Sequence, residues 1–283
     1  MQTISQIRAL CAERGLRPRQ RLGQHFLHDK NQLAKLIDAA QLVAGDLVLE
    51  VGAGTGTLTE ALLDAHAEVI ACEIDRGLAQ IIEDRLGQRL TLIRGDCLDR
   101  RRCLSPNLID AIAGRDFKLI ANLPYGIASP LMAALLLDHP CCVGQYVTIQ
   151  KEVADRLLAS PGGKDYGPLG ILVQTYAKVK RIGTVSPGCF WPQPKVTSAM
   201  LAILPAPPGR AGANEGADLS DALTSSDARH AFARFVTDLF TRRRKQLGAI
   251  FGRDRPWPEG VTCEMRPEML TNRQLVALWR DLA

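Results

Sequence analysis

Short apolar runs alternate with helical patterns of apolar residues between residue 31 and about residue 160 of the chain. The apolar runs predict strands at residues 47–51, 68–73, 90–93, 117–121 and 143–149. Apolar positions at helical spacing predict helices at residues 58–65, 78–86, 130–137 and 151–159. Strands this apolar have no wet face, and their strict alternation with helices therefore indicates an α/β fold, with a parallel sheet covered on both sides.

The region after this alternation predicts a linker and a second, helical domain. Residues 195–204 have the composition of a late strand, at an edge or in a hairpin. A stretch rich in Pro, Gly and Ala begins at residue 205, and apolar residues return at helical spacing in 232–240 and 269–282. We therefore expect a large α/β domain, a linker and a small all-helical domain, at residues 1–204, 205–218 and 219–283.

Composition excludes several classes of protein. The 283 residues are 46% hydrophobic and 23% charged, which is ordinary for a globular protein and excludes collagen, coiled coils and wholesale disorder. No apolar run approaches the roughly 18 to 20 residues that cross a bilayer, and no signal peptide is visible, so we expect a cytoplasmic protein without a membrane partner. The eight cysteines form no CxxC pair and the histidines do not cluster with them, which predicts neither disulfides nor a metal site.

The net charge of +5 is unevenly distributed along the chain. Residues 1–30 carry six Lys and Arg against two Asp and Glu, whereas residues 31–204 carry 17 against 18. This basic arm and a basic run near the C-terminus could contact the phosphates of a nucleic acid, and the alternative is a solvated helix face. The candidates are Arg17, Arg19, Arg21, Arg243, Arg244 and Lys245. A third basic run, at 100–102, has less weight because Asp96 and Asp99 offset its charge.

The strand predicted at 47–51 runs into a glycine-rich loop. Its sequence, Glu50-Val-Gly52-Ala-Gly54-Thr-Gly56, gives the spacing G-x-G-x-G after an acid. A dinucleotide-binding loop would read G-x-G-x-x-G, but threonine follows here. The observed spacing is typical of methyltransferases that depend on S-adenosylmethionine (SAM), and a purely structural tight turn is the alternative.

Acidic residues follow the next two predicted strands. Glu73 ends the strand at 68–73, where a carboxylate can accept hydrogen bonds from both ribose hydroxyls of SAM. Asp75 has the position of a helix N-cap instead. Asp96 follows the strand at 90–93 and can accept a hydrogen bond from the adenine amino group, with an ordinary turn aspartate as the alternative.

The segment Asn122-Leu123-Pro124-Tyr125, after the strand predicted at 117–121, carries the chemistry of base methylation. The lone pair of an aromatic amino group is delocalised into its ring, so the neutral amine is a poor nucleophile. The Asn122 side-chain oxygen and the Leu123 carbonyl can accept its N–H groups and aim the lone pair at a methyl group. Pro124 fixes the turn, and Tyr125 can stack on the base. A proline-directed turn with a capping asparagine is the alternative.

The order of these motifs resembles the ribosomal RNA adenine dimethyltransferase family, and within it the enzymes that act on small-subunit RNA. The matching segments are 23–27, 50–56, 73, 95–96, 122–125, 150–156, 190–196 and 243–245. The resemblance implies a Rossmann-like SAM-dependent methyltransferase fold whose sheet is mostly parallel with one antiparallel strand. It also implies an enzyme that dimethylates the exocyclic N6 of two adjacent adenosines, and we expect this enzyme to be a monomer. These adenosines lie in the 3′-terminal hairpin loop of the small-subunit (16S) RNA, so the partner is the immature small subunit.

The resemblance further implies roles for individual residues. A segment over the cofactor joins the motifs above in binding SAM, through His25, Leu27, Gly52, Gly54, Glu73, Asp96 and Asn122. Phe190 reaches the target adenine from the side opposite Tyr125. The chain departs from the family's usual asparagine at His25, and again at Gly126, which leaves the loop after Tyr125 looser.

Three other functions remain open. One is a large-subunit RNA adenine methyltransferase of the antibiotic-resistance type, which Leu123 and the long C-terminal region disfavour because resistance enzymes tend to isoleucine there. Another is a non-catalytic RNA-binding or transcription factor on the same fold, which the intact 122–125 motif disfavours. The third is an NAD-dependent dehydrogenase, which Thr57 disfavours.

Overall fold

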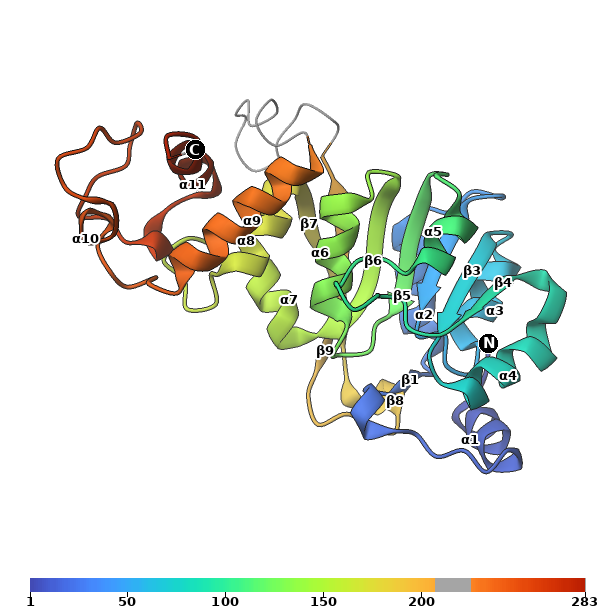
Figure 1. The fold of residues 1–283 in the computed structure, drawn as a ribbon. Coiled ribbons are helices and arrows are strands. Elements are labelled where there is room, and N and C mark those ends of the chain that lie inside the picture. The colour runs from blue at the N-terminus through green and yellow to red at the C-terminus, as the bar shows by residue number, and fades with distance from the viewer. Residues whose placement is uncertain (207–224, 283) are drawn as a thin grey trace. The chain divides into compact units, whose positions relative to one another are not determined.

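The computed structural model describes residues 1–206 and 225–282, which form two compact units (Figure 1). The first unit comprises Met1–Leu135, His139–Ala154 and Lys180–Ile203. The second comprises Leu136–Asp138, Asp155–Val179 and the described part of Leu204–Ala283. Each unit has its own buried apolar cluster and is described by itself.

The described residues contain a seven-stranded sheet in the order β4-β3-β2-β5-β6-β9-β7 (Figure 1). The strands are β2 Leu47–Val51, β3 Glu68–Glu73, β4 Thr91–Arg94, β5 Phe117–Asn122, β6 Cys142–Gln150, β7 Ala177–Val185 and β9 Ser198–Pro205. Strands β2 to β6 pair in parallel, and β9 pairs antiparallel to β6. The predicted α/β fold is therefore confirmed. All five residues of β2 are buried, which explains why its sequence is apolar apart from Glu50.

Helices flank the sheet, and several of them begin after a residue whose side chain caps them. They are α1 Ile4–Glu13, α2 Lys30–Ala40, α3 Thr57–Asp64, α4 Arg76–Leu86, α5 Pro106–Ile112, α6 Ala128–Asp138 and α7 Lys151–Leu157. Helix α2 lies on β5 and β6, α3 on β3, and α4 on β3 and β4. The Asp75 carboxylate accepts from the backbone N–H groups of Gly77 and Leu78, so its predicted role as the N-cap of α4 is confirmed.

A small two-stranded sheet joins the N-terminal arm to a much later segment. β1 (Phe26–Leu27) pairs antiparallel with β8 (Phe190–Trp191), so that Leu27 lies opposite Phe190. The backbone N–H of His28 also donates to the Cys189 carbonyl, at 3.0 Å. This pairing fixes residues 23–27, the segment of the arm that is predicted to cover the cofactor, on the body of the first unit. This segment is called the cofactor-covering segment below.

The second unit is helical and has a separate core. Its helices are α8 Pro168–Tyr176, α9 Ser226–Phe240, α10 Leu247–Phe251 and α11 Asn272–Arg280. Phe232, Val236 and Leu275 are buried in this core, as the apolar spacing predicts. The Tyr166 hydroxyl donates to the Leu270 carbonyl at 2.8 Å, which ties the segment before α8 to the C-terminal helices.

Three features differ from the sequence predictions or extend them. β9 is not an edge strand, because β7, which was not predicted, lies outside it. Residues 155–179 belong to the helical unit and not to the first, since Tyr166 packs in the helical core. The predicted linker lies outside the described residues from 207 onward. None of the described helices is both long and apolar enough to span a membrane.

Candidate functional site

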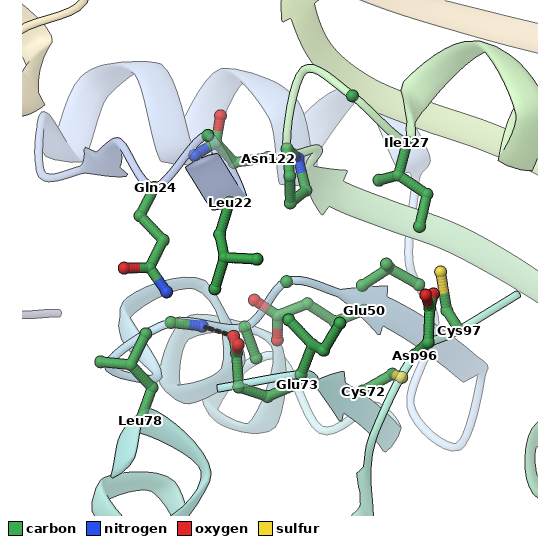
Figure 2. A pocket seen from close by; sticks show the side chains of 18 of the residues that line it. Leu22, Gln24, Glu50, Cys72, Glu73, Leu78, Asp96, Cys97, Asn122 and Ile127 are labelled. Carbon is green, nitrogen blue, oxygen red and sulfur yellow. Dashed lines mark hydrogen bonds between the residues drawn. The ribbon is translucent and has the colours of Figure 1, made fainter. Parts of the chain in front are cut away.

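A cavity of about 410 Å³ lies in the first unit at the carboxyl ends of β2, β3, β4 and β5 (Figure 2). This end of an open α/β sheet is where such folds bind ligands, and the volume suits a small molecule. The predicted site residues that line it are Arg21, His25, Leu27, Gly52, Gly54, Glu73, Asp96, Asn122 and Pro124. The sequence therefore predicts one site from segments that are far apart in the chain.

The glycine loop after β2 forms one wall of the cavity. Gly52 has a φ of +76°, and a Cβ atom there would lie 2.9 Å from the Pro124 ring. Gly54 has a φ of +63°, and a Cβ atom there would lie 2.8 Å from the Phe26 ring. Both positions therefore need glycine for two reasons, a left-handed backbone and the close approach of a neighbouring ring.

Glu73 is buried at the end of β3, and backbone groups hold both of its carboxylate oxygens. Oε2 accepts from the Gly54 N–H and Oε1 from the Asp75 N–H, each at 2.8 Å. Burial raises the pKa of Glu73 to about 7, and the two N–H donors partly offset this rise. The carboxylate is fixed beside the glycine loop, and its remaining lone pairs are left for a ligand.

Glu50, the acid before the glycines, is 1% exposed and also lines the cavity (Figure 2). The Thr59 hydroxyl donates to its Oε2 at 2.6 Å. Burial and, to a smaller extent, the nearby charge of Glu73 raise the pKa of Glu50 to about 8, although the hydrogen bonds from Thr59 act in the opposite direction. The sequence predicted no separate role for Glu50, although its place before the first glycine marked it.

Asp96 follows β4 in the chain and lines the cavity at some distance from Glu73 (Figure 2). Its Oδ1 accepts from the Leu98 N–H at 3.0 Å, as a turn aspartate would. Among the described residues nothing donates to its Oδ2, so the turn role and a ligand-binding role are compatible.

Asn122 ends β5 and lines the same cavity. Its Nδ2 donates to the His25 carbonyl oxygen at 2.8 Å, which fixes the orientation of the carboxamide. No described residue donates to Oδ1, so this oxygen remains available as an acceptor. The Leu123 N–H donates to the Thr148 carbonyl at 3.0 Å, and the Leu123 side chain is buried.

The two aromatic residues predicted to hold a base do not line the cavity. Tyr125 is half-buried, its hydroxyl lies 3.2 Å from Ser198 Oγ, and burial raises its pKa. Phe190 is only 3% exposed, because β8 is covered where it pairs with β1. Neither ring is presented to the cavity in this conformation, and their stacking role stays a prediction.

His25 lies in the cofactor-covering segment and contacts both Tyr125 and the chain just after Phe190. Its ring centroid lies 5.5 Å from that of Tyr125. Its Nδ1 lies 2.6 Å from the Pro192 carbonyl oxygen, and Nδ1 must carry the proton because a carbonyl can only accept. Gln24, which no role was predicted for, also lines the cavity, and its Nε2 is 3.5 Å from Asp75.

The basic residues predicted to contact RNA divide into paired and unpaired groups. Arg19 Nε lies 3.3 Å from Asp75 Oδ2, and Arg243 Nε lies 2.8 Å from Glu268 Oε2. These two side chains therefore also form ion pairs within their own units. The remaining candidates form no ion pair within the described part of the chain: Arg17, Arg21, Arg244 and Lys245.

The polar groups that line the cavity include acidic side chains and one free amide oxygen. Within residues 1–206 and 225–282, no group of three or more His, Cys, Asp or Glu side chains is arranged to hold a metal ion. The carboxylates of Glu73 and Asp96 suit a ligand that carries hydroxyl and amino donors and positive charge. The free oxygen of Asn122 adds one acceptor at the opposite end.

The chain is similar to a known protein family and to individual proteins over most of its length. A sequence model of the family described as "Ribosomal RNA adenine dimethylase" matches residues 15–277. The "Ribosomal RNA small subunit methyltransferase A" of Mycobacterium avium is 41% identical over 206 residues, which are 70% of this chain. The chain thus spans 63% of the length of that relative.

Two further comparisons cover more of the chain. The protein of the same name from Rhodococcus opacus is 37% identical over 255 residues, covering 88% of this chain and 80% of the relative. The crystal structure of a dimethyladenosine transferase from Plasmodium falciparum superposes with a TM-score of 0.71 at 26% identity. That superposition covers 91% of this chain and 97% of the other.

Proposed function

Since the chain belongs to the ribosomal RNA adenine dimethylase family, we propose that it transfers methyl groups to N6 of two adjacent adenosines in the 3′-terminal hairpin loop of small-subunit (16S) RNA. The names of its relatives from Mycobacterium avium and Rhodococcus opacus support the small subunit as target. The proposed partner is the immature small ribosomal subunit in the cytoplasm, and the enzyme acts as a monomer with SAM as the methyl donor.

The cavity fits SAM on grounds independent of the relatives' names. SAM presents ribose hydroxyls, an adenine amino group, an ammonium and a sulfonium, all of which carboxylates can bind. Glu73 is fixed beside the glycine loop to accept from the ribose, and Asp96 has an oxygen free for the adenine amino group. His25 and Leu27 cover the ligand from the arm, and Gly52 and Gly54 let the backbone approach it.

The observation that carries the proposal is the oriented, unpartnered oxygen of Asn122. Bound SAM would supply an electrophilic methyl group: the N–C bond forms as the methyl–sulfur bond breaks, S-adenosylhomocysteine leaves, and the nitrogen gives up one proton to water. The protein therefore need only prepare the nitrogen. Asn122 Oδ1 and the Leu123 carbonyl accept the two N–H groups of adenine N6 and draw its lone pair out of the ring. The His25 carbonyl keeps the Asn122 amide from turning over, so that the oxygen and not the nitrogen faces the base.

Holding the base is the role proposed for Tyr125 and Phe190. Stacking on an aromatic ring is worth roughly 1–3 kcal/mol per base, which is comparable with the cost of extracting a base from its stack. Phe190 is buried here, so the segment that carries it must shift before its ring can meet the adenine.

In vitro methylation of small-subunit particles tests the function. We expect the protein and SAM to convert two adjacent adenosines of the terminal hairpin loop to dimethyladenosine, mapped by primer extension and mass spectrometry. Particles of the large subunit, incubated in parallel, should remain unmethylated. Methylation of large-subunit RNA alone would instead identify the antibiotic-resistance activity, and no transfer to either RNA would favour a non-catalytic RNA-binding protein.

A further inference from the structure

Residues 98–104, between β4 and α5, form a closed and well-anchored turn. Leu98 and Leu104 pair as an antiparallel bridge, and both side chains are buried. Within the turn the Asp99 N–H donates to the Cys103 carbonyl at 2.9 Å. Asp99 Oδ1 accepts from the backbone N–H groups of Arg101, at 2.8 Å, and Cys103, at 3.0 Å. The carboxylate of Asp99 therefore holds the backbone of the turn.

The three arginines at the tip of this turn are exposed and lack acidic partners. Within the described residues, Arg100, Arg101 and Arg102 form no ion pair. Asp96 and Asp99, whose charges were expected to offset those of the arginines, form no ion pair with them within the described residues. Asp96 Oδ1 accepts from the Leu98 N–H, and Asp99 Oδ1 is directed into the turn.

Two of these arginines lie at the edge of the cavity, and the third does not. Arg100 and Arg102 line it next to Asp96, whereas Arg101 is absent from its lining. Arg21, which precedes the cofactor-covering segment, lines the same cavity and is also unpaired within the described chain. The cavity that holds carboxylates inside thus has three unpaired guanidinium groups contributed by two separate segments.

The charge of the cofactor does not account for these arginines. SAM carries one carboxylate against an ammonium and a sulfonium, so it is a net cation and is suited to Glu73 and Asp96. Guanidinium groups instead match phosphates, which they bind through two parallel hydrogen bonds. An RNA that places one base in the cavity runs its backbone across the cavity rim, where these guanidinium groups lie.

We propose that Arg100 and Arg102, together with Arg21, bind phosphates of the RNA whose adenosine enters the cavity. This inference rests on the proposed function, because it needs an RNA substrate whose target base enters there. The turn is held by Asp99 before RNA arrives, so the two arginines are presented without an ordering step. Phosphate contacts of this kind fix the register of the RNA and do not read its sequence.

Three charge-neutral variants with side chains of similar length test the inference: R100Q, R102Q and, as a matched control from the same turn, R101Q. The binding constant for small-subunit RNA is measured over a series of salt concentrations, and SAM affinity is measured by calorimetry. R100Q and R102Q should each weaken RNA binding by about three- to tenfold and reduce the slope of log K against log salt by about 0.7. R101Q should change both far less, and all three should bind SAM like the wild type.

The possible outcomes distinguish a failure of this inference from a failure of the proposed function. If R100Q and R102Q bind RNA with the same salt slope as R101Q, the arginines are a solvated surface and the inference is overturned. If they lose SAM affinity and keep RNA affinity, the arginines serve the cofactor carboxylate, which also overturns it. Failure of the proposed function is seen separately, because the wild-type protein itself would then not methylate small-subunit particles.

Discussion

The two ends of the cavity are built in different ways. At the β3 end, the Glu73 carboxylate is held by two backbone N–H groups at 2.8 Å. At the β5 end, the Asn122 amide is held by one bond from its own Nδ2 to the His25 carbonyl, and its oxygen has no donor among the described residues. The first arrangement fixes an acid beside the glycine loop that is proposed to bind SAM. The second leaves one acceptor free for a substrate that arrives later.

This difference predicts that the two ends can be separated by mutation. Changes at the glycine loop and Glu73 should act through SAM affinity, because those groups are part of one hydrogen-bonded wall. Changes at Asn122 should act on turnover, because its free oxygen is proposed to accept a hydrogen bond from the reacting amine. The variants below test this separation, beginning with the largest expected effect.

Gly54→Ala should abolish function through the cofactor end. A methyl group at φ +63° lies 2.8 Å from the buried Phe26 ring, so both strain and overlap oppose it. We expect the free energy of unfolding to fall by about 2–4 kcal/mol and SAM affinity to fall by about 100-fold or more. Thermal unfolding and calorimetry measure the two effects.

Gly45→Ala is the matched control for this substitution. Gly45 has a φ of +88°, but nothing lies within 4 Å of the position of its Cβ. It should therefore lose only about 1 kcal/mol from backbone strain and bind SAM normally. Equal loss of SAM affinity in both variants would show that the overlap with Phe26 is irrelevant.

Glu73→Gln should weaken SAM binding by about 10- to 100-fold and change turnover at saturating SAM much less. The amide keeps one acceptor but turns an NH₂ group toward a backbone donor, so one buried hydrogen bond is lost. Titration calorimetry and the SAM dependence of the rate measure the effect. Glu68→Gln, at the exposed start of the same strand, should leave SAM affinity unchanged, and an equal loss there would contradict the assignment.

Glu50→Gln should remove a pH dependence of stability. The pKa of Glu50 is raised by burial from 4.5 to about 8, so between these values the folded chain holds a proton that the unfolded chain has lost. The stability contribution is complete below pH 4.5, and it is lost at about 1.4 kcal/mol per pH unit as the pH rises through that window.

Denaturant unfolding between pH 5.5 and 7.5 measures this difference between the wild type and E50Q. The exposed residue Glu13 supplies the control, because Glu13→Gln should follow the wild-type profile. Parallel profiles for the wild type and E50Q would mean that Glu50 is ionised in the folded protein.

Tyr125→Phe should have the smallest effect, about twofold or less on the rate with RNA. It removes the hydroxyl that lies 3.2 Å from Ser198 Oγ and keeps the ring. Tyr125→Ala removes the ring as well and should lower kcat/KM for RNA by about tenfold or more. Similar losses in the two variants would assign the role to the hydroxyl and not to stacking.

The cofactor end of this site was largely predictable from the sequence, because its signals are local. The apolar run of β2, the glycine spacing and the acids at strand ends each follow from a few neighbouring residues. The N-cap role of Asp75 followed from the same kind of pattern.

Other features depend on contacts between distant segments and left no local signal. Examples are the position of β9 inside the sheet, the packing of Tyr166 in the helical core and the burial of Phe190 against β1. The count of formal charges along the chain also does not show which basic side chains are paired. Arg19 in the favoured arm is paired with Asp75, whereas Arg100 in the discounted run is unpaired within the described residues.

The central claim is that the Asn122 oxygen activates the adenine amine while the opposite end holds the cofactor. Its most direct test is Asn122→Ala, with SAM affinity measured by calorimetry and turnover measured on small-subunit particles. We expect turnover to fall by about 10²- to 10³-fold while the Kd for SAM changes by less than about threefold. Wild-type turnover in this variant, or a loss that is entirely explained by weaker SAM binding, would contradict the claim.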